Sequence, residues 1–474
     1  MLALGPTFIK TGQVLSTRPD LVPEVYAEEF ATLQDAVPPS PYSEMISSLA
    51  KDVGSHSYDD FDPDPIAGGS LAQVYEAVYD GTRVAVKVRR PDIKDRIDTD
   101  LRVIRRLLPV IVFFAPNRYR FSLRNMADDF ERIIQEELDF EREARMMDEI
   151  RNNFSDDSTV RIPRVYTDVS SERVLTMEYI VGIKITDVDQ LEAAGFDPKP
   201  IAHKVANAYF TMGLVHGVFH GDPHPGNLSV DDEGRIVFYD FGMSGRFTPA
   251  MQENVIQLYL SVVNRDVETI TDILIKIDVL DPNVDRVKMA AMLSLMMDEF
   301  EGKEDVNWRD ILTDALAELQ QFPFRLPPNI MLVIRIGTVS EGVLRELDPE
   351  FDFIHAAREF LRRHGFMERG ARMMFDEMRT DVEASAKALV RVPPKLERAL
   401  DAIIRDEAQT QRSTVDQVQL QTIAKPLGYV LLAGFTILGA SILSMVDLRY
   451  GIGGLLVAGL FVVLFYRSIR TEPK

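Results

Sequence analysis

The feature that most constrains the fold is the run FHGDPHPGNLSVDDEGRIVFYDFGMSG, which begins at Phe219. Asp222 and Asn227 lie five residues apart in a segment rich in glycine and proline, and Asp240 follows thirteen residues after Asn227. The apolar stretch 236–239 leads directly into Asp240 and is typical of a short buried strand. The pattern therefore predicts two polar loops that the fold holds next to each other.

The side chains of these loops suit the chemistry of phosphate transfer. Asp240 and Asn227 offer hard oxygen ligands for Mg²⁺, which neutralises the charge of a bound triphosphate. Asp222 can accept the proton of an attacking hydroxyl or orient a water molecule. The spacing is that of the kinase catalytic loop H-R-D-x-x-x-x-N followed by Asp-Phe-Gly. We therefore predict a phosphoryl-transfer site with Asp222 as a catalytic residue and Asn227 and Asp240 as metal ligands.

A second stretch, DPIAGGSLAQVYEAVYDGTRVAVKV from Asp64 to Val88, has the pattern of strands joined by tight turns. Its Asp-Gly pair predicts a two-residue hairpin turn. Lys87 lies in the apolar run V-A-V-K-V, which is similar to the V-A-I-K strand of kinases. A lysine at a strand edge is the alternative. Because an unpaired buried charge is costly, Lys87 would need an anionic partner.

Nucleotide contacts are predicted from this stretch and from the later strand VLTMEYIVG. The glycine-containing loop would approach the phosphates, and backbone groups at the end of VLTMEYIVG would pair with an adenine. An ordinary connection between two lobes fits the second segment equally well. The predicted nucleotide-binding residues are Ala67, Gly68, Gly69, Ser70, Val74, Lys87, Glu178 and Ile180.

The partner of Lys87 is expected among the acids of QEELDFEREARMM, within a long helix predicted from about residue 122 to residue 151. Asp139 and Glu143 are four residues apart and share a helical face. Glu137 lies about 200° around the helix from Asp139, at roughly 100° per residue. One acid could therefore meet Lys87 while another engages a different group, and the spacing alone does not say which.

The order of patterns predicts an α+β fold with a small β-rich lobe followed by a large helical lobe, as in protein kinases. The chain has 474 residues, enough for such a domain and further segments. We divide it into an N-terminal helical extension at 1–60, a small lobe at 61–180, a large lobe at 181–384, a helical connector at 385–425, a transmembrane helical hairpin at 426–466 and a basic cytoplasmic tail at 467–474.

Two uncharged runs near the C-terminus predict the membrane hairpin. The run from Pro426 to Val446 has the roughly 20 residues that a spanning helix needs, and the run from Tyr450 to Tyr466 is near the lower limit. Basic residues flank both outer ends, so both ends would face the cytoplasm. Two buried core helices are the alternative, although such helices rarely lack polar residues all round. The hairpin could also pair two copies into a homodimer, although neither run contains G-x-x-x-G.

Composition excludes several other classes of protein. A net charge of −21 argues against a nucleic-acid partner. The chain has no cysteine, which excludes disulfides, thiolate metal sites and a cysteine nucleophile. The first ten residues lack the basic and apolar segments of a signal peptide. We therefore expect the catalytic part on the cytoplasmic side of the cell membrane.

Taken together, these motifs resemble the UbiB family of atypical kinase-like proteins. The similarity includes a K-x-G-Q motif at Lys10, Gly12 and Gln13, an E-x-D motif at Glu137 and Asp139, and the stretches AGGSLAQVYEA, VAVKVRRP, FEREARMM, HGDPHPGN and DFG. By itself, the Lys10 segment would be an unremarkable N-terminal helix. The similarity covers most of the chain and keeps the motifs in the order of the family.

The resemblance implies a kinase-like fold that binds ATP or ADP with Mg²⁺. It also implies a membrane-anchored protein that supports isoprenoid-quinone (ubiquinone) biosynthesis or prenyl-lipid handling, with prenyl lipids, quinone precursors and quinone-biosynthesis proteins as partners. In the family, the K-x-G-Q helix covers the site where a protein substrate would bind. This blocks protein-kinase activity and leaves ATPase activity. Carried over, Lys10 and Gln13 lie near Glu137 and Asp139 in a regulatory role, and Lys87 pairs with Glu143.

One loop departs from the pattern of the family, which is usually A-A-A-S. Gly68 and Gly69 replace two of the alanines here. Glycine permits positive φ and a closer approach of the backbone to phosphate. We therefore expect this loop to be more competent for ATP than an alanine-rich loop.

Two other functions share parts of the pattern. Small-molecule kinases of the aminoglycoside or choline kinase kind also carry H-G-D-x-H-x-G-N, but the Lys10–Gln13 segment and the hairpin argue against them. A non-catalytic nucleotide-sensing scaffold on the membrane would have the same fold and differ only in turnover.

Overall fold

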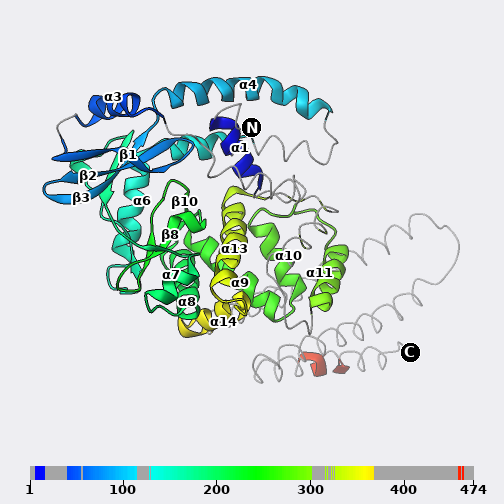
Figure 1. Cartoon of the computed structure of the whole chain (residues 1–474). Coiled ribbons are helices and arrows are strands. Elements are labelled where there is room, and N and C mark those ends of the chain that lie inside the picture. Colours follow the sequence, from blue (N-terminus) through cyan, green and yellow to red (C-terminus); the bar gives the residue numbers. More distant parts are fainter. Residues whose placement is uncertain are drawn as a thin grey trace, which may run out of the picture. The chain divides into compact units, whose positions relative to one another are not determined.

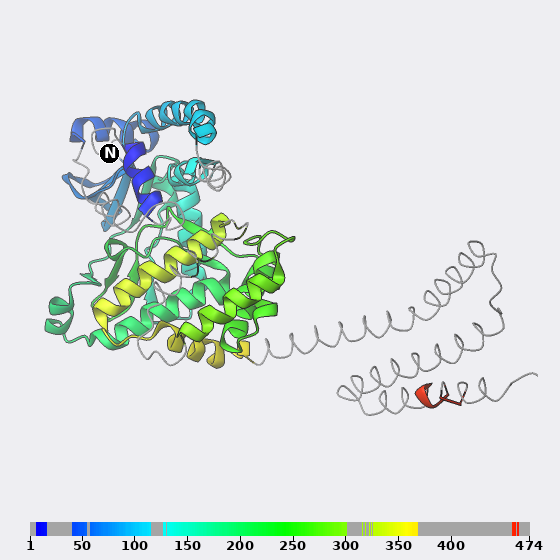
Figure 2. The same cartoon turned by 90° about the vertical axis from the view of Figure 1, so that its right-hand side faces the viewer.

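The structure is a computed structural model. It describes residues 6–16, 40–54, 57–114, 127–128, 130–300, 326–367, 457–460 and 462–463, together with single positions between 315 and 324. The chain divides into two units, 1–366 and 367–474, and nearly all described elements belong to the first unit (Figures 1 and 2).

The small lobe is built around an antiparallel sheet of four strands. Their order is β1 (Asp60–Gly68), β2 (Ala72–Tyr79), β3 (Thr82–Arg89) and β5 (Val174–Glu178). The predicted hairpin turn lies between β2 and β3, where Asp80 and Gly81 have φ values of 50° and 69°. Two positive φ values in a two-residue turn are typical of the type I′ hairpin, so the Asp-Gly signal is confirmed.

The two faces of this sheet have different roles. Val84, Val86 and Val88 alternate along β3 and are buried with Tyr75 of β2, and helix α3 (Tyr42–Asp52) packs on the same cluster. Because successive side chains of a strand point to opposite faces, Lys87 belongs to the other face. The register of β3 therefore separates the lysine from the core that stabilises the strand.

Helix α6 (Phe140–Asn153) packs against that other face of the sheet. Its N-cap is Asp139, which has an extended backbone and accepts a hydrogen bond from the Arg142 N–H at 2.9 Å. Residues 130–137 form a separate helix before this cap. The prediction of one continuous helix over 122–151 is therefore wrong, because a capping carboxylate satisfies N–H groups that begin a new helix.

Two further helices lie on the outside of the small lobe. The first half of helix α4 (Ile93–Phe114) packs against the helix at 130–137. Helix α1 (Pro6–Ser16) contacts α4, and Thr7 Oγ1 donates to the Asp100 carboxylate at 2.6 Å. Figure 1 shows α4 along the top of the lobe and α1 beneath it.

The large lobe contains two small sheets that carry the polar loops. One sheet has the order β4 (Val160–Arg161), β9 (Ile236–Phe238), β8 (Leu228–Val230) and β6 (Ile183–Lys184), and the other pairs β10 (Ser244–Arg246) with β7 (Val218–His220). The loop from β7 to β8 carries Asp222 and Asn227, and the loop from β9 to β10 carries Asp240. The pairing of these strands is what brings the two loops together.

Helices surround these strands (Figure 1). They are α7 (Val188–Ala193), α8 (Pro198–Phe210), α9 (Pro249–Val263), α10 (Val267–Lys276), α11 (Arg286–Phe300), α13 (Pro328–Leu347) and α14 (Phe353–Arg363). Both α13 and α14 pack against α8. The predicted mixture of a sheet-rich small lobe and a helical large lobe is confirmed.

The predicted hairpin at 426–466 lies outside the described residues, apart from 457–460 and 462–463. The connector at 385–425 and the tail at 467–474 also lie outside them. Among the helices that the structure describes, none is both long enough and apolar enough to span a membrane. The hairpin therefore stays a prediction.

Candidate active site

The first polar loop is closed by its own side chains. Asn227 Nδ2 donates to Asp222 Oδ2 at 3.1 Å and to the Asp222 carbonyl at 3.2 Å. His224 Nδ1 accepts from the Gly226 N–H at 3.1 Å, and the Tyr239 N–H donates to the Asn227 carbonyl at 3.1 Å. The last bond ties this loop to the strand that leads into Asp240. Because the amide nitrogen of Asn227 donates to Asp222, its side-chain oxygen is the atom that could bind a cation.

Lys87 joins three parts of the site. Its Nζ lies 2.8 and 2.9 Å from the Glu143 carboxylate oxygens and 3.0 Å from Asp240 Oδ1. The Gly242 N–H donates to the same Asp240 oxygen at 3.0 Å, and the Phe241 N–H donates to Glu143 at 3.3 Å. Strand β3, helix α6 and the loop after β9 thus meet at one ammonium group.

Burial and charge shift the acidities of this cluster in opposite directions. Burial lowers the pKa of Lys87, but Asp240 and Glu143 outweigh this effect and raise the pKa above its usual value. Burial raises the pKa of Glu143 to about 7, against the opposing charge of Lys87. Burial also raises the pKa of Asp240, but Lys87 and the Gly242 N–H hold it well below its usual range. Lys87 and Asp240 therefore present a fixed cation and a fixed anion to a ligand.

The predicted phosphate loop forms the tip of the β1–β2 hairpin. Ala67 and Gly68 end β1, and Gly69 and Ser70 lie in the turn before β2. The Gly69 N–H donates to the Ala72 carbonyl at 2.8 Å, and Val74 lies opposite Lys87 in the β2–β3 register.

The two loop glycines do not use the left-handed conformation that glycine permits. Neither Gly68 nor Gly69 has positive φ. An added Cβ would meet nothing within 4 Å at Gly68 and only the Ala72 carbonyl, at 3.7 Å, at Gly69. The positive φ that glycine permits is therefore not used at either position, and the expected preference for ATP stays a prediction. Closer approach of the backbone to phosphate remains a physical reason for glycine here.

Helix α1 places Lys10 in the same site. Lys10 Nζ forms an ion pair with Glu137 at 2.5 Å and lies 3.9 Å from Met243 Sδ. The side chains of Lys10 and Glu137 are only 12% and 9% exposed. Gly12 is buried in the same helix, whereas the side chain of Gln13 lies outside the described part of the structure. Burial raises the pKa of Glu137, and the charge of Lys10 opposes that rise.

The three acids that the sequence left unassigned have three different partners. Glu143 binds Lys87, and Glu137 binds Lys10. Asp139 is the N-cap of α6, and its carboxylate lies 3.7 Å from Arg145. The helix break at Asp139 explains this arrangement, because it removes the fixed angular relation that a continuous helix imposes on the three side chains.

Arg335 of α13 is a site residue that the sequence patterns did not indicate. Its Nη2 donates to Asp222 Oδ1 at 2.6 Å, and its side chain is only 6% exposed. Burial raises the pKa of Asp222, but Arg335 and then Lys10 outweigh burial and lower it. The two residues are 113 positions apart and no motif surrounds Arg335. A single sequence offers no signal for such a contact.

Arg142 is a second residue that sequence reasoning missed. Its guanidinium donates to the Gly242 carbonyl at 3.3 Å and to the Ser244 carbonyl at 3.0 Å, and it forms an ion pair with Glu136 at 3.0 Å. Arg142 therefore connects helix α6 to the loop that follows Asp240 and holds this loop in place. Its place in the stretch FEREARMM, beside Glu143, was the available signal.

The predicted adenine contacts lie at the end of β5. The Glu178 N–H donates to the Arg164 carbonyl at 2.8 Å, and the Glu178 carboxylate binds Arg161 at 2.6 Å. The Ile180 carbonyl accepts from the Tyr239 hydroxyl at 3.3 Å. The N–H of Glu178 is therefore already engaged in a hydrogen bond. Of the backbone groups of Glu178, only the carbonyl is then expected to contact an adenine.

The residues fit the magnesium nucleotide that a kinase-like fold implies. Asp240 and Asn227 provide a carboxylate and an amide oxygen from two connected loops. Within the described residues there is no group of three or more His, Cys, Asp or Glu side chains that could hold a metal. Mg²⁺ is usually bound by one or two carboxylates together with phosphate oxygens and water. The donor set therefore suits Mg²⁺ that binds together with nucleotide phosphates.

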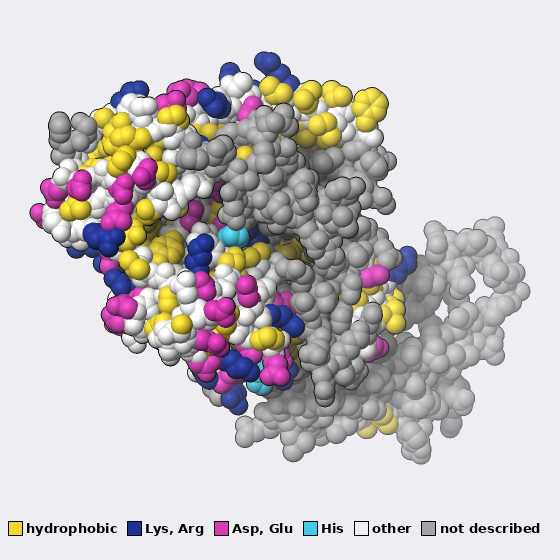
Figure 3. Space-filling model, viewed as in Figure 1, with side chains coloured by type: hydrophobic (Ala, Val, Ile, Leu, Met, Phe, Trp, Pro, Cys, Tyr) yellow, Lys and Arg dark blue, Asp and Glu magenta, His cyan; other side chains and the backbone are white. Residues whose placement is uncertain are grey.

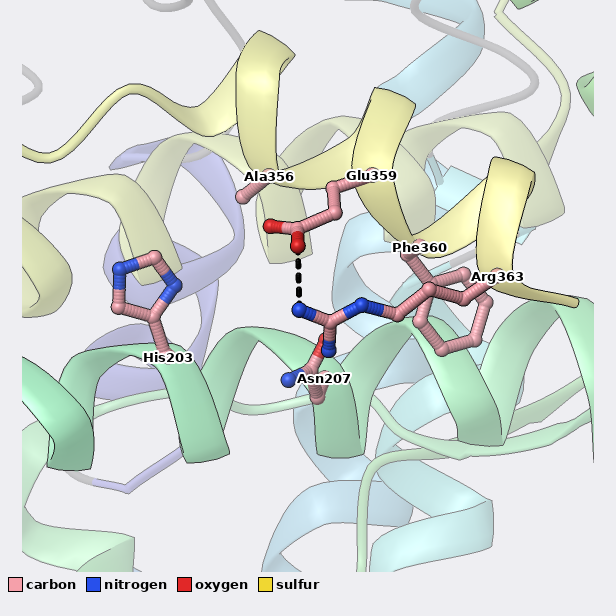
Figure 4. Close-up of a pocket in the computed structure, with 6 residues that line it drawn as sticks. All are labelled: His203, Asn207, Ala356, Glu359, Phe360 and Arg363. Atoms are coloured by element: carbon pink, nitrogen blue, oxygen red, sulfur yellow. Dashed lines mark hydrogen bonds and ion pairs between the residues drawn. The ribbon is translucent and has the colours of Figure 1, made fainter.

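A cavity of about 280 Å³ lies between α8 and α14, away from these loops (Figure 4). Its lining residues are His203, Asn207, Ala356, Glu359, Phe360 and Arg363. Arg363 and Glu359 form an ion pair with each other there. None of these residues belongs to the predicted site, so the cavity has no part in the chemistry assigned to it.

The two lobes and the Lys87, Glu143 and Asp240 cluster define a protein-kinase-like protein. A family model, the ABC1 atypical kinase-like domain, matches residues 32–274. The chain belongs to this family, which is also called ABC1/UbiB, and the predicted family is thereby confirmed.

Relatives and a solved structure agree with this assignment. The Arabidopsis thaliana protein ACTIVITY OF BC1 COMPLEX KINASE 7, chloroplastic, is 31% identical over 100% of this chain and 71% of its own length. An uncharacterized protein of Synechocystis is 34% identical over 94% of this chain and 78% of its own length. The structure of Rv3197 from Mycobacterium tuberculosis in complex with erythromycin covers 71% of this chain and 87% of its own, with a TM-score of 0.50 and 21% identity. The last comparison supports the fold alone.

Proposed function

We propose that the protein is an atypical kinase or ATPase that binds Mg-ATP where Lys87 of the small lobe meets Asp240 of the large lobe. The observation that carries this proposal is the position of Lys87, within 3.0 Å of both Glu143 and Asp240. A lysine held in this way by a helix carboxylate and by the Asp-Phe-Gly carboxylate is the arrangement that orients nucleotide phosphates in kinases. Lys87 would bind phosphate oxygens, and Glu143 would position Lys87.

The other residues have separate roles in this proposal. Asp240 and Asn227 would hold Mg²⁺, which when bound neutralises the charge of the phosphates. Asp222 would orient the attacking group through its carboxylate. Because Arg335 lowers the pKa of Asp222, this residue is a weak base in the described state and is better suited to orient a water or hydroxyl than to take its proton.

The surroundings of Asp222 favour water or a small acceptor over a protein chain. Arg335 bonds to its carboxylate at 2.6 Å, and Lys10 of α1 lies nearby against Met243 and Glu137. In this proposal, Arg335 and Lys10 would leave less room beside Asp222 for a peptide hydroxyl than for water or a small acceptor. We infer that the intact protein hydrolyses ATP or acts on a small or lipid hydroxyl.

The wider role that we propose rests on the family and on the uncharged runs at 426–466. The protein would be anchored in the cell membrane by that hairpin, with its catalytic part on the cytoplasmic side. It would act on, or be regulated by, prenyl lipids or quinone precursors, and would support isoprenoid-quinone biosynthesis together with other proteins of that pathway.

The test is ATP hydrolysis by the full-length chain with and without prenylphenol-like lipids and anionic membranes. The comparison uses Asp240→Asn and, as a matched control, Asp232→Asn, since Asp232 is exposed and away from the cluster. Turnover that lipid stimulates, that Asp240→Asn loses and that Asp232→Asn keeps would support the proposal. Phosphate transfer to a soluble alcohol would favour a small-molecule kinase. Mg-nucleotide binding with no turnover under any condition would favour the non-catalytic scaffold.

A further inference from the structure

Helix α4 carries an apolar stripe that the nucleotide site does not use. Its exposed apolar side chains from residue 103 to its end are Val103, Leu107, Val110, Ile111, Phe113 and Phe114. Phe113 and Phe114 are 71% and 79% exposed, and their rings contact each other edge to face. Figure 3 shows this apolar group at the end of α4, at the top of the small lobe. A contiguous exposed apolar patch usually marks an interaction surface.

The spacing of these residues places most of them on one face. Counting from Val103, the positions 107, 110, 111 and 114 follow the i+4, i+7, i+8 and i+11 steps of a helical face. The buried face of the first half behaves differently, because Ile93, Ile97 and Leu101 pack into the small-lobe core. The helix therefore uses its first half to dock on the protein, while its second half, apart from the buried Val112, presents apolar side chains outward.

The charge around the stripe is unusual for this chain. From Leu101 to Phe114 the helix contains Arg102, Arg105 and Arg106 and no acidic residue, although the chain as a whole has a net charge of −21. All three arginines are exposed. Arg105 pairs with Glu131 of the neighbouring helix, and Arg102 bonds within its own helix. An apolar helical face bordered by arginines is the pattern that binds at the surface of anionic lipid bilayers.

We propose that the α4 stripe, residues 103–114, docks on an anionic lipid bilayer, with its apolar side chains between the acyl chains and its arginines at the headgroups. Lipid is favoured over a second copy of the chain, because anionic headgroups would complement the arginines of this helix, whereas a second copy would bring the same positive charge. This inference does not depend on the proposed nucleotide chemistry or on the predicted hairpin.

The absence of cysteine makes a local test direct. Val110→Cys introduces a single attachment site for a nitroxide label in the full-length chain. The labelled protein is placed in nanodiscs of phosphatidylcholine, with or without phosphatidylglycerol, and the label's collisions with lipid-soluble oxygen and with a water-soluble nickel reagent are compared. Glu192→Cys on α7 is the matched control, since it is an exposed helical position on the large lobe. Thermal unfolding and ATP turnover of each labelled chain show whether the fold and the nucleotide site are intact.

The expected result is a shift of the Val110 label from nickel-accessible to oxygen-accessible when phosphatidylglycerol is present, with no shift at Glu192. Changing Arg102 and Arg106 together to Gln should lower the ratio of docked to undocked label about 25-fold, roughly fivefold for each charge. A Val110 label that stays water-accessible in both kinds of disc, in a chain with normal unfolding temperature, overturns the proposal whatever the turnover. Spin–spin broadening at Val110 without lipid would instead assign the stripe to a second copy and would also overturn it.

Discussion

The ion pair between Lys10 and Glu137 links helix α1 to the site, and replacing Lys10 with Met removes one of its two charges. At 2.5 Å the attraction amounts to roughly 7 kcal/mol for an effective dielectric constant of about 20. Removing two nearly buried charges from water offsets much of this attraction, so we expect a net loss of about 3 kcal/mol in the free energy of unfolding at about pH 8. Without Lys10, burial and the charges of Asp240 and Asp222 act on the Glu137 carboxyl unopposed, and its pKa rises further above the unfolded value. The folded state then binds the extra proton, so the loss shrinks as the pH falls to about 5.

The assay is urea unfolding of four chains: wild type, Lys10→Met, Glu137→Gln and the double variant. We expect the double variant to be more stable than Lys10→Met, with a coupling of at least about 2 kcal/mol, because it leaves no unpaired buried carboxylate. Lys51→Met on α3 is the control, since Lys51 is exposed, and it should change stability by less than about 0.5 kcal/mol. If the effects of the two single substitutions simply add, or if the loss is the same at both pH values, the reasoning is refuted.

Three further predictions concern other parts of the fold. Arg142→Gln removes two hydrogen bonds to carbonyls of the Asp-Phe-Gly loop. We expect it to lower the free energy of unfolding by about 1–3 kcal/mol and to lower kcat. An unchanged kcat would show that this loop does not need the arginine. Burial raises the pKa of Asp231, but hydrogen bonds from Arg235 lower it overall, so Asp231→Asn should cost about 2 kcal/mol in thermal unfolding at neutral pH. This loss of stability should disappear as the pH falls below the unfolded-state pKa of Asp231, about 3.9, and through its lower folded-state pKa. A loss that does not depend on pH would contradict the view that the Asp231 carboxylate stabilises the fold through its charge. Gly68→Ala with Gly69→Ala should fold without strain and change the ratio of ATP to ADP affinity, and unchanged affinities and turnover would exclude a role for these glycines.

Much of the site could be predicted because its residues are close in sequence. Asp222, Asn227 and Asp240 fall within nineteen positions, separated by a hairpin of short strands that returns the second loop to the first. Lys87 was predictable for a different reason, since a lysine in an apolar strand, unless it lies at the edge, needs a buried anionic partner. The lobes followed from the order of the strand and helix patterns.

The parts that could not be predicted depend on contacts between distant segments. Arg335 reaches Asp222 across 113 positions, and the packing of α13 against α8 and β10, rather than any local pattern, sets that contact. The helix break at Asp139 was predictable in principle, because an aspartate three residues before Arg142 can cap a helix, but the surrounding residues also favour a continuous helix. That break decides which acid meets which lysine. The backbone conformation of the loop glycines could not be predicted either, and in the structure the hairpin closes through the Gly69 to Ala72 bond without positive φ.

The central claim is that Lys87 and Asp240 form part of a site for Mg-ATP, and binding tests it more directly than turnover does. The measurement is the affinity for a fluorescent ATP analogue, with Mg²⁺ and with EDTA, for wild type, Asp240→Asn and the exposed control Asp232→Asn. We predict that Mg²⁺ tightens binding to the wild type and to Asp232→Asn by at least about tenfold, and that Asp240→Asn loses this dependence while it keeps its unfolding temperature. Equal affinity and equal Mg²⁺ dependence in all three chains would contradict the claim.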